Sequence, residues 1–360
     1  IKDEDYIEHL LVASTHDTVL CFTSLGRVHW IKVYDLPQAG RGAKGKPLVN
    51  LVQLVESEKV TAILPLRGYA EGQFVFMATA DGTVKRIKLT EFSRPRSSGI
   101  NAINLDGDNT LIGVAVTDGL QDIMLFSNQG KAIRFKETDV RAMGRAASGV
   151  RGMRLPVGAR IVSMVATSEP SELAEADVIV LHPEADNAEL GEDVVLEDVL
   201  DAEVDVVEDI TDEVEDENED LAALENHAQI LIACANGYGK RTPVSKFTLR
   251  RRGGQGVVAI QTTERNGELV AAVSACQSND LLLISDMGTL VRTRVGEVSV
   301  MSRTAQGVTL IRLSNEEQLV GVVSLEAPDE EELIVVEATE AETINVETDN
   351  SEPSQESETV

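Results

Sequence analysis

Apolar runs of four to six residues recur along the chain and are separated by short polar stretches. Valine, isoleucine, leucine and threonine dominate these runs, and glycine follows many of them. Runs this short, bounded by turn-forming residues, are typical of β-strands, because a helical pattern needs about ten residues or more. The pattern therefore predicts an all-β protein.

A glycine turn marks the same point of a repeating unit. It follows one apolar run and precedes another, as in "FVFMATADGTV" and "LLLISDMGTLV", which we interpret as a strand, a tight turn and a second strand. We call these glycines the first anchors: Gly26, Gly82, Gly130, Gly237 and Gly288.

A second glycine follows each first anchor after 17 or 19 residues and again precedes an apolar run. These second anchors are Gly45, Gly99, Gly149, Gly256 and Gly307. A third apolar run, such as "LIGVAV" or "LVGVVSL", closes each unit. The regular spacing indicates five repeats of about four short strands each.

Four-stranded units that repeat cannot bury both sheet faces alone, and they usually close into a ring of blades. We therefore predict a propeller-like fold with five complete repeats plus the end of a sixth, because "EHLLVAS" near the start matches a closing run. A linear β-solenoid is the alternative. The expected divisions are a truncated first blade at 1–14, blades at 15–168 and 227–325, an acidic insertion at 169–226 and an acidic tail at 326–360.

Charge is divided unevenly along the chain. The formal net charge of −29 would by itself argue against binding to nucleic acid. However, 169–226 holds 24 acidic residues and 326–360 holds 13, both without Lys or Arg, which leaves +8 on the rest. We expect both acidic segments to be disordered, with an amphipathic helix on binding as the alternative for part of the insertion. The folded part is basic.

Few motifs point to catalysis. The histidines and cysteines lack metal-ligand spacing, so no metal site is predicted. No Ser, His and Asp set stands in a recognisable local context, so no catalytic residue is predicted. We expect Cys21, Cys234 and Cys276 to be buried free thiols in a reducing cytosol, since each lies in an apolar run. "GRGAKGK" at 40–46 approaches a phosphate-binding loop, but Pro47 replaces the required Ser or Thr. No apolar run is long enough to span a membrane.

Arginine dominates two positions of the repeat. Four residues after the first anchors stand Trp30, Arg86, Arg134, Arg241 and Arg292, and four before the second anchors stand Arg41, Pro95, Arg145, Arg252 and Arg303. In a ring of similar blades a repeated residue type forms a band, and a positive band suits the phosphates of duplex DNA. The alternative for any one arginine is a structural ion pair or stacking contact between blades.

We therefore predict sequence-independent binding of double-stranded DNA through these arginines, neighbouring lysines and the "RRRGGQG" cluster at 250–256. The predicted contacts are Arg41, Lys44, Lys46, Lys85, Arg86, Lys131, Arg134, Arg145, Lys240, Arg241, Arg250, Arg251, Arg252, Arg292 and Arg303. A propeller-type protein-interaction module with an acidic partner is the alternative from another functional class.

Several long segments closely resemble the C-terminal, DNA-wrapping domain of bacterial DNA gyrase A. They include "IKDEDYIEHLLVASTHDTVLCFTSLGRVHWIKVYDLP", "FKETDVRAMGRAASGVRGMRL" and "GTLVRTRVGEVSVMSRTAQGV". The resemblance implies a β-pinwheel whose blades exchange strands and whose basic rim wraps DNA, so that ATP-dependent strand passage adds negative supercoils. It further implies an N-terminally truncated fragment, a bacterial cytoplasmic, nucleoid-associated location and DNA gyrase B as partner in an A2B2 holoenzyme. ATP and Mg would bind through that partner, with no cofactor in this segment.

The signature of that family is a box with the sequence Gln-Arg-Arg-Gly-Gly-Lys-Gly. The nearest string here is degenerate at two positions and consists of Arg250, Arg251, Arg252, Gly253, Gly254, Gln255 and Gly256. By repeat register we expect the intact box just before Ile1. The equivalent domain of topoisomerase IV, which lacks an intact box, is therefore the alternative. None of the four tyrosines matches the family's cleavage motif, so this segment alone is not expected to be catalytic.

Overall fold

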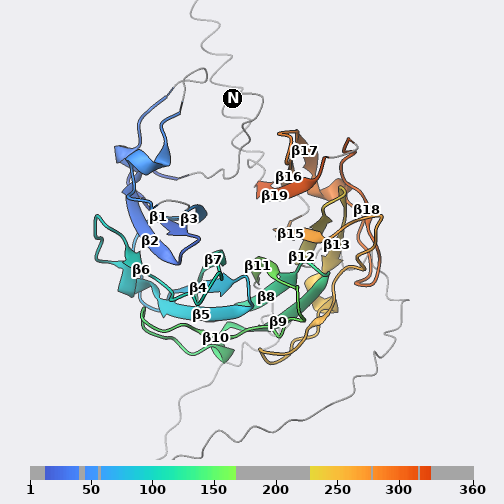
Figure 1. Ribbon diagram of the computed structural model, residues 1–360, viewed down its shortest axis with the longest axis horizontal. Coiled ribbons are helices and arrows are strands. Elements are labelled where there is room, and N and C mark those ends of the chain that lie inside the picture. The colour runs from blue at the N-terminus through green and yellow to red at the C-terminus, as the bar shows by residue number, and fades with distance from the viewer. Residues whose placement is uncertain are drawn as a thin grey trace, which may run out of the picture.

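The strands of the described residues form five antiparallel sheets, which stand as blades around an open arc (Figure 1). The structure is a computed structural model and describes residues 13–39, 45–55, 58–167, 228–276, 279–314 and 317–325. All regular elements in these ranges are strands or short 3-10 turns, so the predicted all-β, propeller-like fold is confirmed. Nearly all of 1–14 and both acidic segments lie outside the described residues.

The first blade shows how each sheet is assembled. A hairpin of β1 (Thr18–Thr23) and β2 (Arg27–Lys32) forms its centre. The closing run of the same unit supplies the inner strand β3 (Val60–Leu66), which pairs with β1. The outer strand β6 (Ile100–Asn101) pairs with β2 but comes from the next unit. The strand that follows a second anchor therefore joins the sheet of the preceding unit, which the repeat pattern did not show.

The later blades follow this order from hairpin to inner and outer strand, except that the described residues supply three strands to the fifth. The second blade consists of β4 (Phe74–Thr79), β5 (Thr83–Lys88), β7 (Leu111–Thr117) and β10 (Val150–Arg151), and the third of β8 (Asp122–Ser127), β9 (Lys131–Lys136), β11 (Ile161–Thr167) and β14 (Val257–Val258). The fourth blade consists of β12 (Gln229–Cys234), β13 (Tyr238–Pro243), β15 (Leu269–Ala275) and β18 (Val308–Thr309). The fifth consists of β16 (Asp280–Ser285), β17 (Leu290–Arg294) and β19 (Leu319–Leu325). The 3-10 turns are η1 (Val33–Asp35), η2 (Leu48–Asn50), η3 (Leu89–Phe92), η4 (Glu137–Asp139), η6 (Val244–Lys246) and η7 (Val295–Glu297).

The apolar core lies between successive blades. Along β4, Val75 and Met77 pack with the first blade, whereas Phe76 and Ala78 pack with the third. Side chains of a strand alternate between its two faces, so a strand with a blade on either side must be apolar throughout. The inner strands β3, β7, β11, β15 and β19 contact one another in turn along the inside of the arc (Figure 1). The outer strands thereby lie on the rim.

The two glycine anchors meet in one joint between neighbouring units. The carbonyl of Gly130, a first anchor, accepts hydrogen bonds from the amides of Ala259 (2.8 Å) and Ile260 (3.1 Å), which follow the second anchor of the next unit. Both Gly130 and that anchor, Gly256, have positive φ angles, of 76° and 77°. A Cβ at Gly256 would lie 2.4 Å from the Ala132 carbonyl oxygen. Glycine is therefore required by the backbone angle and by the close approach of the strands.

Two of the three cysteines occupy the interior as expected. Cys21 and Cys234 are buried, and burial raises the pKa of their thiols to about 11 and about 12. The expectation is wrong for Cys276, which is exposed. It follows the last residue of β15, beyond the part of the apolar run that the neighbouring blades cover.

Candidate nucleic-acid interface

The arginine four residues after a first anchor points at the next blade. In β9, Arg134 donates from Nε to the Oδ2 atom of Asp122 at 2.8 Å. Its Nη1 atom donates to the carbonyl of Val244, at the start of turn η6 of the following unit, at 2.9 Å. The side chain is 7% exposed. Arg134 therefore fastens one blade to the next.

Other units use this position in the same way, and we call it the latch position. Arg241 donates to the carbonyls of Val298 (2.6 Å) and Gly296 (3.2 Å) around turn η7. Arg86 lies 3.3 Å from the Oε1 atom of Glu137 in η4. Burial raises the pKa of this Glu137 carboxyl, although the charge of Arg86 acts in the opposite direction.

Two latch positions differ from this pattern. In the first blade Trp30 replaces the arginine, and its indole Nε1 atom donates to the Phe92 carbonyl in η3 at 2.9 Å. Arg292 lies in the fifth blade, and in the described residues no turn of a following unit covers it. It is 63% exposed, and in the part of the chain that the structure describes its ion-pair partner is Asp280, as Asp122 is that of Arg134.

The latch position corrects the first group of predicted DNA contacts. Arg86, Arg134 and Arg241 are directed into the joint between blades and already bond to protein acceptors. Reaching a phosphate would break those bonds and leave buried carbonyls or carboxylates unpaired. The structural pairing between blades is therefore the better interpretation of this arginine series.

Two lysines among the predicted contacts are also interior residues. Lys85 and Lys240 are fully buried, one residue before the latch position, and their amino groups bond to backbone carbonyls. Burial, reinforced by Arg145, lowers the pKa of Lys85 to about 8. Burial also lowers the pKa of Lys240 to about 7, against the effect of Cys234. Neither lysine can touch DNA in this structure.

The second arginine series lies in the loops that lead to the outer strands. Arg145 is 37% exposed, and its Nε atom is 3.8 Å from the Oε2 atom of Glu91. Arg252 is exposed and donates to the carbonyls of Asp139 and Arg151, at 3.0 and 3.1 Å. Arg303 is half-buried, with its Nη1 atom 3.4 Å from the Val258 carbonyl oxygen. These side chains lie on the rim and remain candidates for DNA contact.

The "RRRGGQG" loop docks on the outer strand of the preceding unit. The Gly253 amide donates to the Gly152 carbonyl at 2.6 Å, and the Arg154 amide donates to the Gly254 carbonyl at 2.8 Å. This docking gathers four exposed arginines, and none of them forms an ion pair with a carboxylate in the described residues. We call this group the rim cluster: Arg151, Arg154, Arg251 and Arg252.

Two members of the rim cluster were missed from the sequence. Arg151 and Arg154 stand two and five residues after the second anchor Gly149. The fifth unit has Arg312 at the later of these positions, but other units have Asn or Gln, so no arginine series marks it. Only the docking of the next unit's loop brings them beside Arg251 and Arg252.

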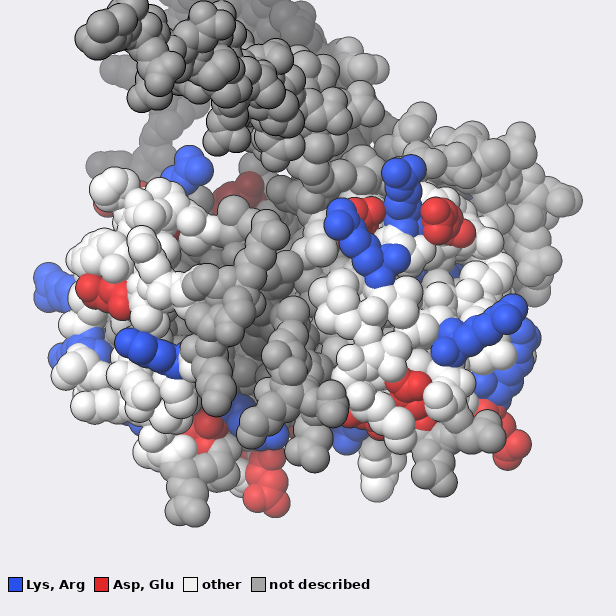
Figure 2. Space-filling model, turned by 90° about the horizontal axis from the view of Figure 1, so that it is seen from above, with Lys and Arg blue, Asp and Glu red and all other residues white. Residues whose placement is uncertain are grey.

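The remaining predicted contacts are less clustered. Lys46 is exposed, Lys131 is half-buried at the start of β9, and the half-buried Arg250 donates its amide to the Arg134 carbonyl at 2.9 Å. Arg41 and Lys44 lie outside the described residues. Figure 2 shows the side on which the arc is open, where basic side chains stand singly or in pairs and several neighbour acidic ones. A continuous positive band is absent from the described part of that side.

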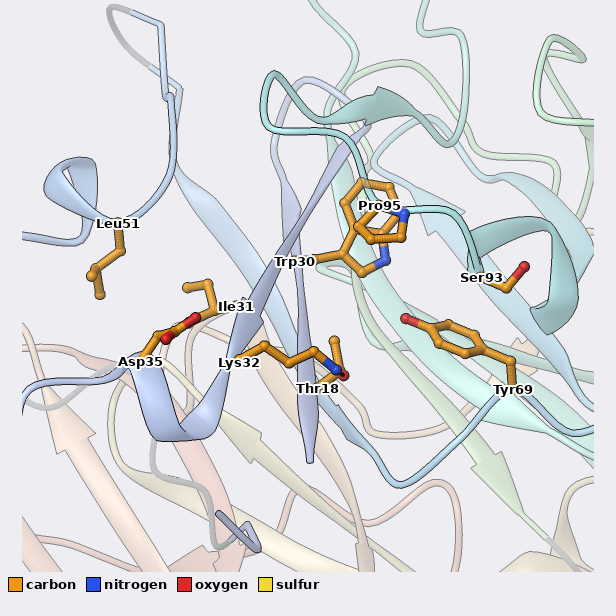
Figure 3. A pocket seen from close by; sticks show the side chains of 9 residues that line it. All are labelled: Thr18, Trp30, Ile31, Lys32, Asp35, Leu51, Tyr69, Ser93 and Pro95. Carbon is orange, nitrogen blue, oxygen red and sulfur yellow. Dashed lines mark hydrogen bonds between the residues drawn. The ribbon is translucent and has the colours of Figure 1, made fainter. Parts of the chain in front are cut away.

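A pocket of about 390 Å³ lies beside the Trp30 latch (Figure 3). Tyr69 points its hydroxyl toward Trp30, and burial raises the pKa of that hydroxyl. Lys32 donates to the Thr18 hydroxyl at 2.6 Å, so two of the polar side chains that line the pocket already bond to each other. The pocket does not bring together an acid, a base and a nucleophile in a catalytic arrangement.

Other site types find no support in the described ranges. No group of three His, Cys, Asp or Glu side chains in them could hold a metal ion. Nor does this part of the chain contain a helix that is long and apolar enough to cross a membrane. The exposed arginines of the rim are thus the strongest chemical feature of the described surface.

Comparison with known families identifies the repeats. The model of the family described as "DNA gyrase C-terminal domain, beta-propeller" matches residues 17–67, 73–118, 121–168, 228–276 and 279–326, one segment for each unit. The chain belongs to this family. The resemblance inferred from the sequence is therefore confirmed, and the insertion lies between two matched segments.

Individual relatives agree with this assignment. DNA gyrase A of Haemophilus influenzae is 45% identical over 340 residues, which cover 94% of this chain and 35% of the relative. The chain thus spans about a third of the length of such relatives. A solved C-terminal domain of DNA topoisomerase IV has a TM-score of 0.67 at 21% identity, covering 91% of this chain and 84% of that one. A gyrase A C-terminal domain has a TM-score of 0.62, also at 21% identity, with coverages of 87% and 83%. At this identity the two structures show the fold alone.

Proposed function

We propose that this chain wraps duplex DNA around its outer rim, as the DNA-wrapping part of a gyrase A-type protein in a type IIA topoisomerase. The observation that carries the proposal is the rim cluster, in which two successive units present four exposed arginines without carboxylate partners in the described residues. Family membership and the 45% identity to the gyrase A of Haemophilus influenzae support gyrase. The solved topoisomerase IV and gyrase A domains are both 21% identical to the chain and do not distinguish the two.

The chemistry of the rim cluster suits a phosphate backbone. Guanidinium groups that neutralise phosphates release condensed counterions, so the affinity for DNA falls steeply as salt increases. Such contacts carry no information about base sequence. The arc also places one unit after another along a curved outer edge (Figure 1), which suits a bent duplex.

The activity of the whole protein belongs to the same proposal, because the chain spans 35% of its relative. In that larger protein, wrapping would bias the DNA crossing offered to the strand-passage gate, so that ATP-driven passage introduces negative supercoils. The catalytic tyrosine would lie outside this segment. DNA gyrase B would join an A2B2 assembly and supply the ATP and Mg sites, in the bacterial cytoplasm at the nucleoid.

The test measures the affinity of the full chain for a duplex of random sequence at several salt concentrations. We expect R151A/R154A to weaken binding and to reduce the slope of log K against log salt by up to about 1.8, or about 0.9 for each lost phosphate contact. The matched control is K59A/R67A, which also removes two exposed positive charges. These two residues lie at either end of the inner strand β3, away from the rim cluster. This control should leave the slope unchanged.

An affinity that stays flat from low to high salt would refute DNA wrapping through this rim. Equal losses in the two double variants would instead show that net charge, rather than the rim cluster, determines binding. Competition between unrelated duplexes completes the test, since contacts to the phosphate backbone predict no preference among them.

A further inference from the structure

Two buried lysines bond from the interior to the loops that carry rim arginines. The Lys85 amino group donates to three backbone carbonyls, those of Ala102 (2.8 Å), Arg145 (2.7 Å) and Ala147 (2.7 Å). A lysine ammonium has three donors, so all of them are used. Two of the acceptors lie in the second-anchor loop of the next unit, on either side of residue 146.

The fourth blade repeats this arrangement. Lys240 stands three residues after its first anchor, as Lys85 does, and donates to the carbonyls of Ser302 and Arg303, the latter at 2.6 Å. In both blades the lysine therefore bonds the backbone of the arginine that precedes the second anchor by four residues. The backbone carbonyls of both arginines point inward to the lysine, whereas the Arg145 side chain is 37% exposed and Arg303 is half-buried, so both reach the surface.

The third blade has no lysine at the position three residues after the first anchor. Ile133 stands there, and its Cδ1 atom would lie 3.6 Å from a Cβ at Gly254 of the "RRRGGQG" loop. That loop is held instead by backbone hydrogen bonds between Gly253, Gly254 and the preceding outer strand. An aliphatic residue is therefore compatible with the blade, and the lysine serves the loop.

We propose that Lys85 and Lys240 are positioning residues for DNA binding, each fixing the next unit's loop so that Arg145 or Arg303 faces outward. This inference rests on the proposed function. Each lysine bonds to the arginine loop of one following unit, and the third bond of Lys85 goes to Ala102 of its own unit. The effect of removing a lysine should therefore be local to one blade of the ring.

A first experiment needs no DNA. The full-length chain and its K85M and K240M variants are treated briefly with trypsin under native conditions, and the cleavage sites are mapped. We expect K85M to accelerate cleavage after Arg145 several-fold while cleavage after Arg303 stays at its original rate, and K240M to show the reverse. If K85M folds poorly, K85I replaces it, since isoleucine is the natural residue of the third blade. Cleavage that rises equally at both loops, or at neither, would overturn the inference.

A second experiment couples each lysine to its arginine. Affinities for a random duplex are measured for K85M, R145A, K85M/R145A and the control pair K85M/R303A. If Lys85 acts by positioning Arg145, the salt slope should fall by about 0.9 in K85M, and R145A should add nothing to it. K85M/R303A should be additive. Additive effects in K85M/R145A would refute positioning even where DNA binding is confirmed. If neither R145A nor R303A weakens binding, these arginines do not contact DNA and the inference fails, whereas the rim-cluster variants test the proposed function separately.

Discussion

Arg134 and Arg292 offer a controlled measurement of what the latch between blades contributes to stability. Both occupy the latch position, and both pair with an aspartate twelve residues earlier on the neighbouring strand, Asp122 or Asp280. They differ in that turn η6 of the next unit covers Arg134, whereas Arg292 is 63% exposed. The substitutions R134M and R292M therefore remove the same ion pair in a buried and an exposed setting.

The expected magnitudes follow from these environments. Removing one partner of a buried ion pair costs about 3–5 kcal/mol, and the lower end applies because the Asp122 side chain is 15% exposed. The Val244 carbonyl loses its charged donor at 2.9 Å, which adds about 1 kcal/mol. We therefore expect R134M to lower the free energy of unfolding by about 4 kcal/mol. An exposed pair contributes about 0–1 kcal/mol, so R292M should lower it by no more than that.

Urea denaturation followed by circular dichroism measures both changes, with the slope against denaturant as a check on the unfolded state. The difference between the two variants, about 3 kcal/mol, isolates the contribution of the covering turn. Similar losses in R134M and R292M would refute the latch, because they would show that the ion pair within the blade accounts for the whole effect.

Two further predictions concern the glycine joint and a buried lysine. We expect G256A to cost about 3 kcal/mol in the free energy of unfolding, because its Cβ would meet the Ala132 carbonyl oxygen at 2.4 Å. The control G107A, with φ of +59° but open space around it, should cost only about 1 kcal/mol, and equal losses would contradict the steric argument. Because burial lowers the pKa of Lys240 from 10.5 to about 7, the unfolded state binds more protons between these pH values. The free energy of unfolding should therefore rise with pH across this window, and K240M should lose that rise, as measured by urea midpoints at pH 7, 8 and 9. A rise of the same size in K240M would show that other groups cause it.

The candidate site was predictable only in part. The sequence indicated a basic rim, and Arg252 and Arg251 do lie there, exposed. Lys85 and Arg134 were misplaced because a strand between two blades is buried on both faces, so a basic side chain on it can reach a carbonyl of the next unit. The repeat register reveals that such a position recurs, but it does not reveal which way the side chain points.

Arg151 illustrates the opposite error. No series of arginines marks its position in the repeat, so periodicity carried no signal for it. Its importance arises from a loop about one hundred residues later, whose Arg252 donates to the Arg151 carbonyl at 3.1 Å. Contacts between residues so distant in sequence depend on how the units stack.

The sequence by itself determined the strands, the glycine turns and the number of described units, because these depend on neighbouring residues: alternation, apolar run length and backbone freedom at glycine. Tertiary structure decided which hairpin receives each outer strand. A two-residue strand such as β10 has too few hydrogen bonds to select a partner alone, so the joint at Gly82 and the covering of the next blade select it. The same stacking determined which basic side chains became internal latches and which stayed on the rim.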